Sequence, residues 1–197
     1  WARRIVGDMR TMREEMRAAR TGLSGHLRLA SIPTALAMLS RITTPFQERH
    51  PDVTFSIVSR NSLQVLSMLE NLEIDAGITY LENEPLGRVT SVPLYAERYN
   101  LITAAGSPLS DRESVTWREV GDLRLCLLTA DMQNRRIINR HLAEAGATVH
   151  PTLESNSMIV LFSHVRTGRW ASIMPHNVAK SFGFPVEIRM IPITEPE

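Results

Sequence analysis

Small hydroxyl side chains stand where two predicted strands give way to helices in the first half of the chain. Ser31 lies near the end of the alternating pattern of residues 26–32, Thr34 follows that pattern, and Ser62 follows that of residues 53–58. A hydroxyl at a helix start can cap the helix, and the neighbouring backbone N–H groups can bind an anion. These positions therefore have two interpretations: N-caps, or contacts to a small polar ligand.

Arg60 lies in the same segment as Ser62. Its guanidinium could pair with a ligand carboxylate through two parallel hydrogen bonds. The alternative is an arginine in a solvated loop, and the residue types alone do not separate the two.

Motifs of enzymatic chemistry are missing from the sequence. It contains no Gly-x-Ser-x-Gly elbow, no Gly-rich phosphate loop and no His-Glu-x-x-His pair, and its six histidines are dispersed. Asp75 falls in a predicted strand and is interpreted as a structural hydrogen-bonding residue rather than a catalytic base. We therefore expect no enzyme, no metal and no cofactor.

Composition indicates an ordinary soluble protein. Apolar residues make up 43%, the net charge is +1, and no stretch approaches the roughly 20 apolar residues of a membrane span. Cys126, the one cysteine, lies in an apolar run and predicts a buried structural thiol rather than a redox sensor. No secretory signal is visible, so we expect a cytoplasmic protein that does not bind membranes, although the chain begins with Trp1.

The elements that must position these residues begin with a predicted helix over residues 1–22. Its apolar residues recur every three or four positions: Trp1, Ile5, Met9, Met12, Met16 and Ala19. We expect this stripe to pack on a second copy of the chain, and packing on the chain's own body is the alternative. Strand and helix patterns then alternate over residues 26–80 and again over residues 123–174, which predicts two α/β lobes with a crevice between them.

Several segments resemble the LysR-type transcriptional regulators, in their order and spacing. They are Phe-x-x-x-x-Pro-x-Val at residues 46–53, Leu-Glu-Ile-Asp-Ala-Gly-Ile at residues 72–78 and Gly-Arg-Trp-Ala-Ser-Ile-Met-Pro at residues 168–175. The third departs from the family pattern, because Arg169 and Trp170 stand where a second glycine is common. We expect this departure to change a loop near the crevice.

The resemblance covers nearly the whole chain and implies an effector-binding domain. Its fold is two Rossmann-like lobes joined by two crossover segments, like a type II periplasmic-binding protein, preceded by a linker helix. The first lobe takes residues 24–97 plus 188–197 and the second takes residues 98–187, with crossovers near residues 95–100 and 183–189. The effector is expected to be a small organic anion bound between the lobes. The expected contacts are Ser31, Pro33, Thr34, Arg60, Asn61, Ser62, Thr103 and Thr129.

The resemblance also implies partners. A homo-oligomer, dimer or tetramer, is expected, and DNA would be bound only through an N-terminal winged helix-turn-helix that these 197 residues lack. Two rivals share the architecture: a periplasmic-type solute-binding protein, which would be a monomer, and a prephenate dehydratase, whose catalytic threonine motif is not identifiable here.

Overall fold

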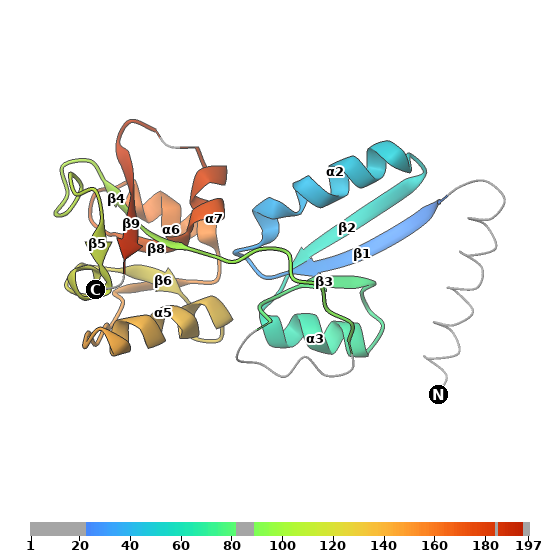
Figure 1. The fold of residues 1–197 in the computed structure, drawn as a ribbon, viewed down its shortest axis with the longest axis horizontal. Helices are drawn as coiled ribbons and strands as arrows, with labels where there is room; N and C mark the ends of the chain where they lie inside the picture. Colours follow the sequence, from blue (N-terminus) through green and yellow to red (C-terminus); the bar gives the residue numbers. More distant parts are fainter. Residues whose placement is uncertain (1–22, 82–88, 184, 195–197) are drawn as a thin grey trace. The chain divides into compact units, whose positions relative to one another are not determined.

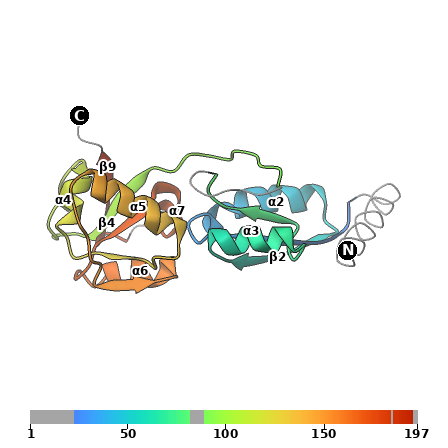
Figure 2. The ribbon, with the colours of Figure 1, turned by 90° about the horizontal axis from the view of Figure 1, so that it is seen from below.

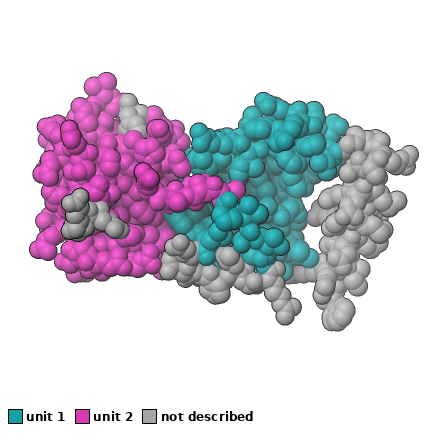
Figure 3. Space-filling model, in the orientation of Figure 1, with its two compact units in different colours: residues 1–93 teal, residues 94–197 magenta. Residues whose placement is uncertain are grey.

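The computed structural model describes residues 23–81, 89–183 and 185–194 of the chain (Figure 1). They belong to two compact units, Trp1–Pro93 and Leu94–Glu197 (Figure 3). The predicted leading helix, residues 1–22, lies outside the described residues. Both units mix helices and strands, as the sequence predicts.

Unit 1 is built on a parallel three-stranded sheet with the order β2-β1-β3. The strands are β1 (Gly25–Ser31), β2 (Val53–Ser59) and β3 (Ala76–Ile78). Because all three run in the same direction, their carboxyl ends lie at one edge of the sheet. The register pairs Ser31 with both Ser59 and Ile78, which brings the three strand ends together.

Two helices cover the unit 1 sheet on opposite sides (Figure 1). They are α2 (Ser40–Arg49), which follows the short turn η1 (Leu36–Met38), and α3 (Ser62–Glu70). The predicted helix start at Thr34 was wrong: residues 32–39 form successive tight turns, such as Ala35 N–H to Ile32 C=O at 3.0 Å. Val65 of α3 packs with Ala30 of β1 in a small core.

Unit 2 contains an antiparallel element that the strand–helix alternation did not predict. Its strands are β4 (Tyr99–Ala104), β5 (Val115–Thr116), β6 (Cys126–Leu128), β7 (Leu153–Ser155), β8 (Ser172–Pro175) and β9 (Ile188–Thr194). The order is β5-β9-β4-β8, with β4 antiparallel to both neighbours, and β6 pairs with β7 in parallel. A parallel bridge between Leu125 and Ala171 connects β6 to β8.

The last strand corrects the predicted lobe composition. We expected residues 188–197 to complete the first lobe after a crossover near residues 183–189, but β9 lies in the second unit and pairs with β4 from Ile188 to Pro192. Ile188 and Ile191 are buried in the two cores of unit 2. Burial of these two side chains keeps the strand in this unit.

The helices of unit 2 cover both faces of its sheet (Figure 2). They are α4 (Trp117–Gly121), α5 (Gln133–Glu144), α6 (Met158–Val165) and α7 (His176–Ser181). Successive residues of β4 point to opposite faces: Leu101 packs with the residues of α4 and α5, and Ile102 with those of α6 and α7. The sheet is therefore buried on both sides.

Candidate functional site

The carboxyl edge of the unit 1 sheet collects most of the predicted contacts. Pro33 and Thr34 follow β1, the segment Arg60–Ser62 follows β2, and Thr79 and Tyr80 follow β3. The Arg60 N–H donates to the Ser31 carbonyl at 3.0 Å, which joins the first two segments. Ligands of open α/β sheets bind at this edge.

Asn61, not Ser62, caps helix α3. The Asn61 side chain accepts from the Gln64 N–H at 2.9 Å, and the Gln64 side chain accepts from the Asn61 N–H at 3.1 Å. This reciprocal arrangement satisfies two backbone donors of the helix start. The interpretation of Ser62 as an N-cap was therefore wrong, and the cap leaves its hydroxyl free for another role.

The Ser62 hydroxyl is buried without a hydrogen-bond partner among the described residues. The side chain is fully shielded from solvent, and the hydroxyl of Thr79 at the end of β3 is in the same condition. Buried polar groups nearly always find a partner, and each exception calls for an explanation. Thr79 was not predicted as a site residue, because nothing in its local sequence pattern separates it from a solvated threonine.

Thr34 also does not cap a helix. Thr34 is 1% exposed, and its hydroxyl lies 3.2 Å from the Tyr80 hydroxyl, so the pair joins the segments after β1 and β3. Ser31, equally buried, donates its hydroxyl to the Ile32 carbonyl at 3.1 Å. Pro33 is buried between them. These side chains shape the edge, and Tyr80 is a second residue that the sequence did not indicate.

Arg60 supplies a cationic group at this edge. Its side chain is exposed, and Nη1 donates to the Ser59 carbonyl at 2.7 Å. No carboxylate of the described residues pairs with it. A guanidinium in this position has donors left for an anion.

Thr129 follows β6 at the corresponding edge of unit 2. Its N–H donates to the Ser155 carbonyl at 3.2 Å, and its hydroxyl is buried with no partner in the described part of the chain. Because β4 is antiparallel to β8, its amino end lies at this same edge. Asn100 of β4 is 3% exposed and lies 3.5 Å, Nδ2 to Nδ1, from His176, the first residue of α7. Both are polar residues that the sequence analysis missed, and a buried Asn inside an apolar strand was the available signal.

Thr103 lies at the other end of the unit 2 sheet. It lies near the carboxyl end of β4 and pairs with Arg189 of β9. The preceding residue, Ile102, pairs with Ser172, which is the first residue of β8. Grouping Thr103 with Thr129 was therefore wrong, because the sequence does not reveal that β4 runs against β8. Thr103 is 2% exposed inside the sheet.

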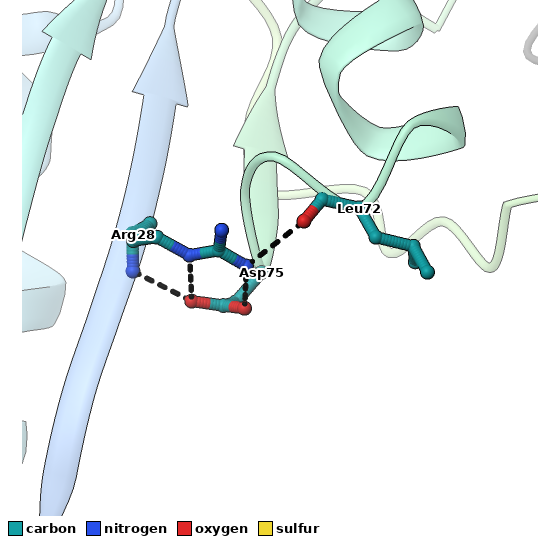
Figure 4. Close-up of polar contacts among 3 residues, drawn as sticks. All are labelled: Arg28, Leu72 and Asp75. Carbon is teal, nitrogen blue, oxygen red and sulfur yellow. Dashed lines mark hydrogen bonds and ion pairs between the residues drawn. The ribbon is translucent and has the colours of Figure 1, made fainter. Parts of the chain in front are cut away.

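The described residues bring no metal-binding cluster to these edges. Among the described residues, no group of three His, Cys, Asp or Glu could hold a metal ion. Burial raises the pKa of the Cys126 thiol to about 11. Asp75 binds Arg28 of the neighbouring strand, so its role is structural, as predicted (Figure 4).

Comparison with known proteins decides the family. Residues 20–197 match the family described as "LysR substrate binding domain". The chain belongs to this LysR family. Its relatives include the HTH-type transcriptional regulator SsuR of Burkholderia cenocepacia, 25% identical over 84% of this chain and 54% of that protein. A probable hydrogen peroxide-inducible genes activator of Mycobacterium avium is 31% identical over 54% of this chain and 34% of that protein. The LysR chain thus spans about half the length of SsuR.

Solved structures show the same fold. A full-length OxyR variant from Pseudomonas aeruginosa superposes with a TM-score of 0.80 at 21% identity, over 99% of this LysR chain and 63% of that one. The effector-binding domain of QuiR in complex with shikimate gives a TM-score of 0.73 at 22% identity, over 88% and 83% of the two chains. The family predicted from the sequence is confirmed by the match to the family, and the α/β fold of the type II periplasmic-binding proteins is confirmed by these structures, whereas the predicted second crossover is not. No helix among the described residues combines the length and the apolar character that crossing a membrane requires.

Proposed function

We propose that this chain is the effector-sensing part of a cytoplasmic LysR-type transcriptional regulator and has no enzymatic activity. The observation that carries the proposal is the buried Ser62 hydroxyl, which has no partner among the described residues although it stands at a helix start. Asn61 already performs the capping, so Ser62 is available to a ligand. The regulators among its relatives support the reading.

The chemistry of the unit 1 edge favours an anion with hydroxyl groups. The first N–H groups of α3 have no partner within the helix, and the helix start carries a partial positive charge. Arg60 adds a full positive charge, while the hydroxyls of Ser62 and Thr79 can donate or accept. A small hydroxylated carboxylate fits these groups, because its carboxylate would bind Arg60 and the helix start and its hydroxyls would bind Ser62 and Thr79.

The mechanism proposed is a shift between conformations of an oligomer. Thr129, at the corresponding edge of unit 2, also has a buried hydroxyl without a partner among the described residues, and it is a further candidate contact for a small molecule. An effector with different affinity for two conformations changes their populations, and a dimer or tetramer would pass the change to DNA-binding segments outside these residues. The domain acts as a sensor because the effector binds one conformation more tightly than the other and so stabilises it.

A solute-binding protein is the second candidate, and the relatives named above do not favour it, because they are transcriptional regulators. Oligomeric state separates the two functions. Sedimentation equilibrium of the 197-residue chain should give a dimer or tetramer for the regulator, and a monomer for the solute-binding protein.

A thermal-shift screen tests the site. The panel consists of small hydroxylated carboxylates and begins with shikimate, which the QuiR domain holds. A compound that binds the native state raises its apparent stability by mass action, by about 2.7 kcal/mol at a hundred times its Kd. The Ser62→Ala variant should lose most of this shift, because it removes a hydroxyl from the binding edge.

Ser67→Ala is the matched control, since Ser67 lies on the same helix with an exposed side chain. It should keep the full response. A shift that survives in Ser62→Ala and in Arg60→Gln would place the effector elsewhere and remove the basis of the proposal.

A further inference from the structure

Four residues of unit 2 form a surface that the proposed function does not use. We call Arg124, Thr152, Arg169 and Trp170 the Trp170 patch. Arg124 precedes β6, Thr152 precedes β7, and Trp170 precedes β8. These parallel strands begin at the edge opposite to the one where Thr129 lies, so Arg169 and Trp170 lie at the other end of the unit 2 sheet from Thr129.

The patch is held by specific contacts around the indole ring. The Thr152 hydroxyl accepts hydrogen bonds from Trp170 Nε1 at 3.0 Å and from Arg124 Nε at 3.3 Å. The guanidiniums of Arg124 and Arg169 lie 4.9 and 5.5 Å from the ring centroid, within the range of a cation–π interaction. Two cations share one ring, so positive charge is concentrated at a fixed place.

That charge is not balanced. Within the part of the chain that the structure describes, neither Arg124 nor Arg169 forms an ion pair, and both side chains are exposed. Other arginines of the unit do have acidic partners, as Arg112 has Glu119 and Arg135 has Glu154. The Trp170 patch therefore offers guanidinium donors to a partner from outside.

We propose that the Trp170 patch is a docking surface for an acidic segment of another protein. Arginine and aromatic side chains are enriched at protein interfaces, and a guanidinium binds a carboxylate through two hydrogen bonds. Contacts to Trp170 and Thr152 already restrict Arg124, which lowers the cost of ordering it on binding. Residues 94–197 hold 11 basic and 11 acidic residues, so the unit has no overall charge to attract a polyanion such as nucleic acid.

Fluorescence anisotropy tests the surface directly. The probe is a fluorescein-labelled peptide of alternating glutamate and glycine, measured at low ionic strength against the 197-residue chain. The wild-type chain should bind it, and the Arg124→Gln/Arg169→Gln double variant should bind it about tenfold more weakly. Circular dichroism establishes that the variant is folded.

The control has the same charge change elsewhere on the unit. Arg118→Gln/Arg140→Gln alters two exposed arginines of α4 and α5 and should weaken binding less than about twofold. An equal loss in both double variants would show unspecific attraction and overturn the proposal. So would tighter binding of a labelled oligothymidylate of equal charge, or no binding of the peptide to the wild-type chain. These measurements use no effector, so their outcome does not depend on the proposed effector site at Ser62.

Discussion

The Asp75 carboxylate receives three hydrogen bonds from Arg28, and together they fasten β3 to β1. Oδ2 accepts from the Arg28 N–H at 2.7 Å and from Nε at 3.2 Å, and Oδ1 accepts from Nη2 at 2.8 Å (Figure 4). Nη2 also donates to the Leu72 carbonyl at 3.1 Å, where the backbone adopts a positive φ of 57°. One arginine thus holds the turn between α3 and β3.

Asp75→Asn should destabilise unit 1. The amide side chain cannot accept all three hydrogen bonds, so a donor of Arg28 loses its acceptor. We expect a loss of about 1–2 kcal/mol, reduced from the value of a buried pair because both side chains are about a third exposed. Urea unfolding measures it. Glu48→Gln, an exposed change in the same unit, should alter stability by less than about 0.5 kcal/mol, and a similar loss there would refute the argument.

Gly77→Ala should push α3 away from the sheet. A Cβ at this position in β3 would lie 2.4 Å from Val65 Cγ1, closer than van der Waals contact permits. We expect a loss of about 1–3 kcal/mol in urea unfolding, the usual cost of overpacking a core. Adding Val65→Ala removes the clashing methyl, so the two changes together should cost less than the sum of the single changes, by about 1 kcal/mol. If the cost of the double change equals the sum of the two single costs, the clash between the new Cβ and Val65 is relieved in another way.

Strong local patterns accounted for the elements that the sequence located well. Alternation over residues 26–32 and 53–58 predicted β1 and β2 to within a residue or two, and the strand–helix pattern over residues 123–174 predicted helices in the part of the chain where α5 (Gln133–Glu144) lies. The direction of β4 was not predictable in this way, because hydrogen-bond partners a long way along the chain decide it. Thr103 and β9 were both misplaced because the antiparallel direction of β4 was not predicted.

The candidate site was predicted in part, for a related reason. Position at or just after the end of a strand brought Ser31, Thr34 and Ser62 to one edge, since parallel strands share their carboxyl end. Which side chain caps α3 depended on a competition between Asn61 and Ser62, and Gln64 decides it by completing a capping box with Asn61. Tyr80 could not be identified, because its contact with Thr34 spans 46 residues.

Protonation of the Glu119 carboxylate should make unit 2 less stable in acid. Hydrogen bonds from the N–H and hydroxyl of Thr116, with a contribution from the charge of Arg112, hold the pKa of Glu119 below its usual value. A carboxylate with a lowered folded-state pKa adds stability above its unfolded pKa, and this is lost as the pH falls through the folded pKa. Glu119→Gln should therefore flatten the acid side of the stability curve, measured by urea unfolding at a series of pH values below neutral.

The conservative Thr116→Ser change keeps both donors to the Glu119 carboxylate. It should retain the acid dependence of the wild-type chain. A curve for Glu119→Gln that falls as steeply in acid as the wild-type curve would show that other carboxylates cause the loss.

Cys126 should not respond to oxidants in the native state. The thiol is fully buried and its Sγ lies 3.7 Å from the Leu161 carbonyl, while burial raises its pKa to about 11. The thiolate is the reactive species, so almost none is present at neutral pH. A thiol reagent such as DTNB should label the chain only after unfolding in guanidinium chloride. Rapid labelling of the native chain, or a sulfenic acid at Cys126 after hydrogen peroxide treatment, would contradict the prediction.

Asn61 and Ser62 should have opposite effects on stability although they are adjacent. Asn61→Ala removes the cap of α3 and should cost about 1 kcal/mol. Ser62→Ala removes a buried hydroxyl that has no partner among the described residues, so it should leave stability unchanged or raise it by up to about 1 kcal/mol. Urea unfolding of the effector-free chain measures both. A gain in stability combined with a lost effector response is the pattern of a residue kept for binding rather than folding. A loss of stability in Ser62→Ala comparable with that in Asn61→Ala would instead mean that the hydroxyl supports the fold.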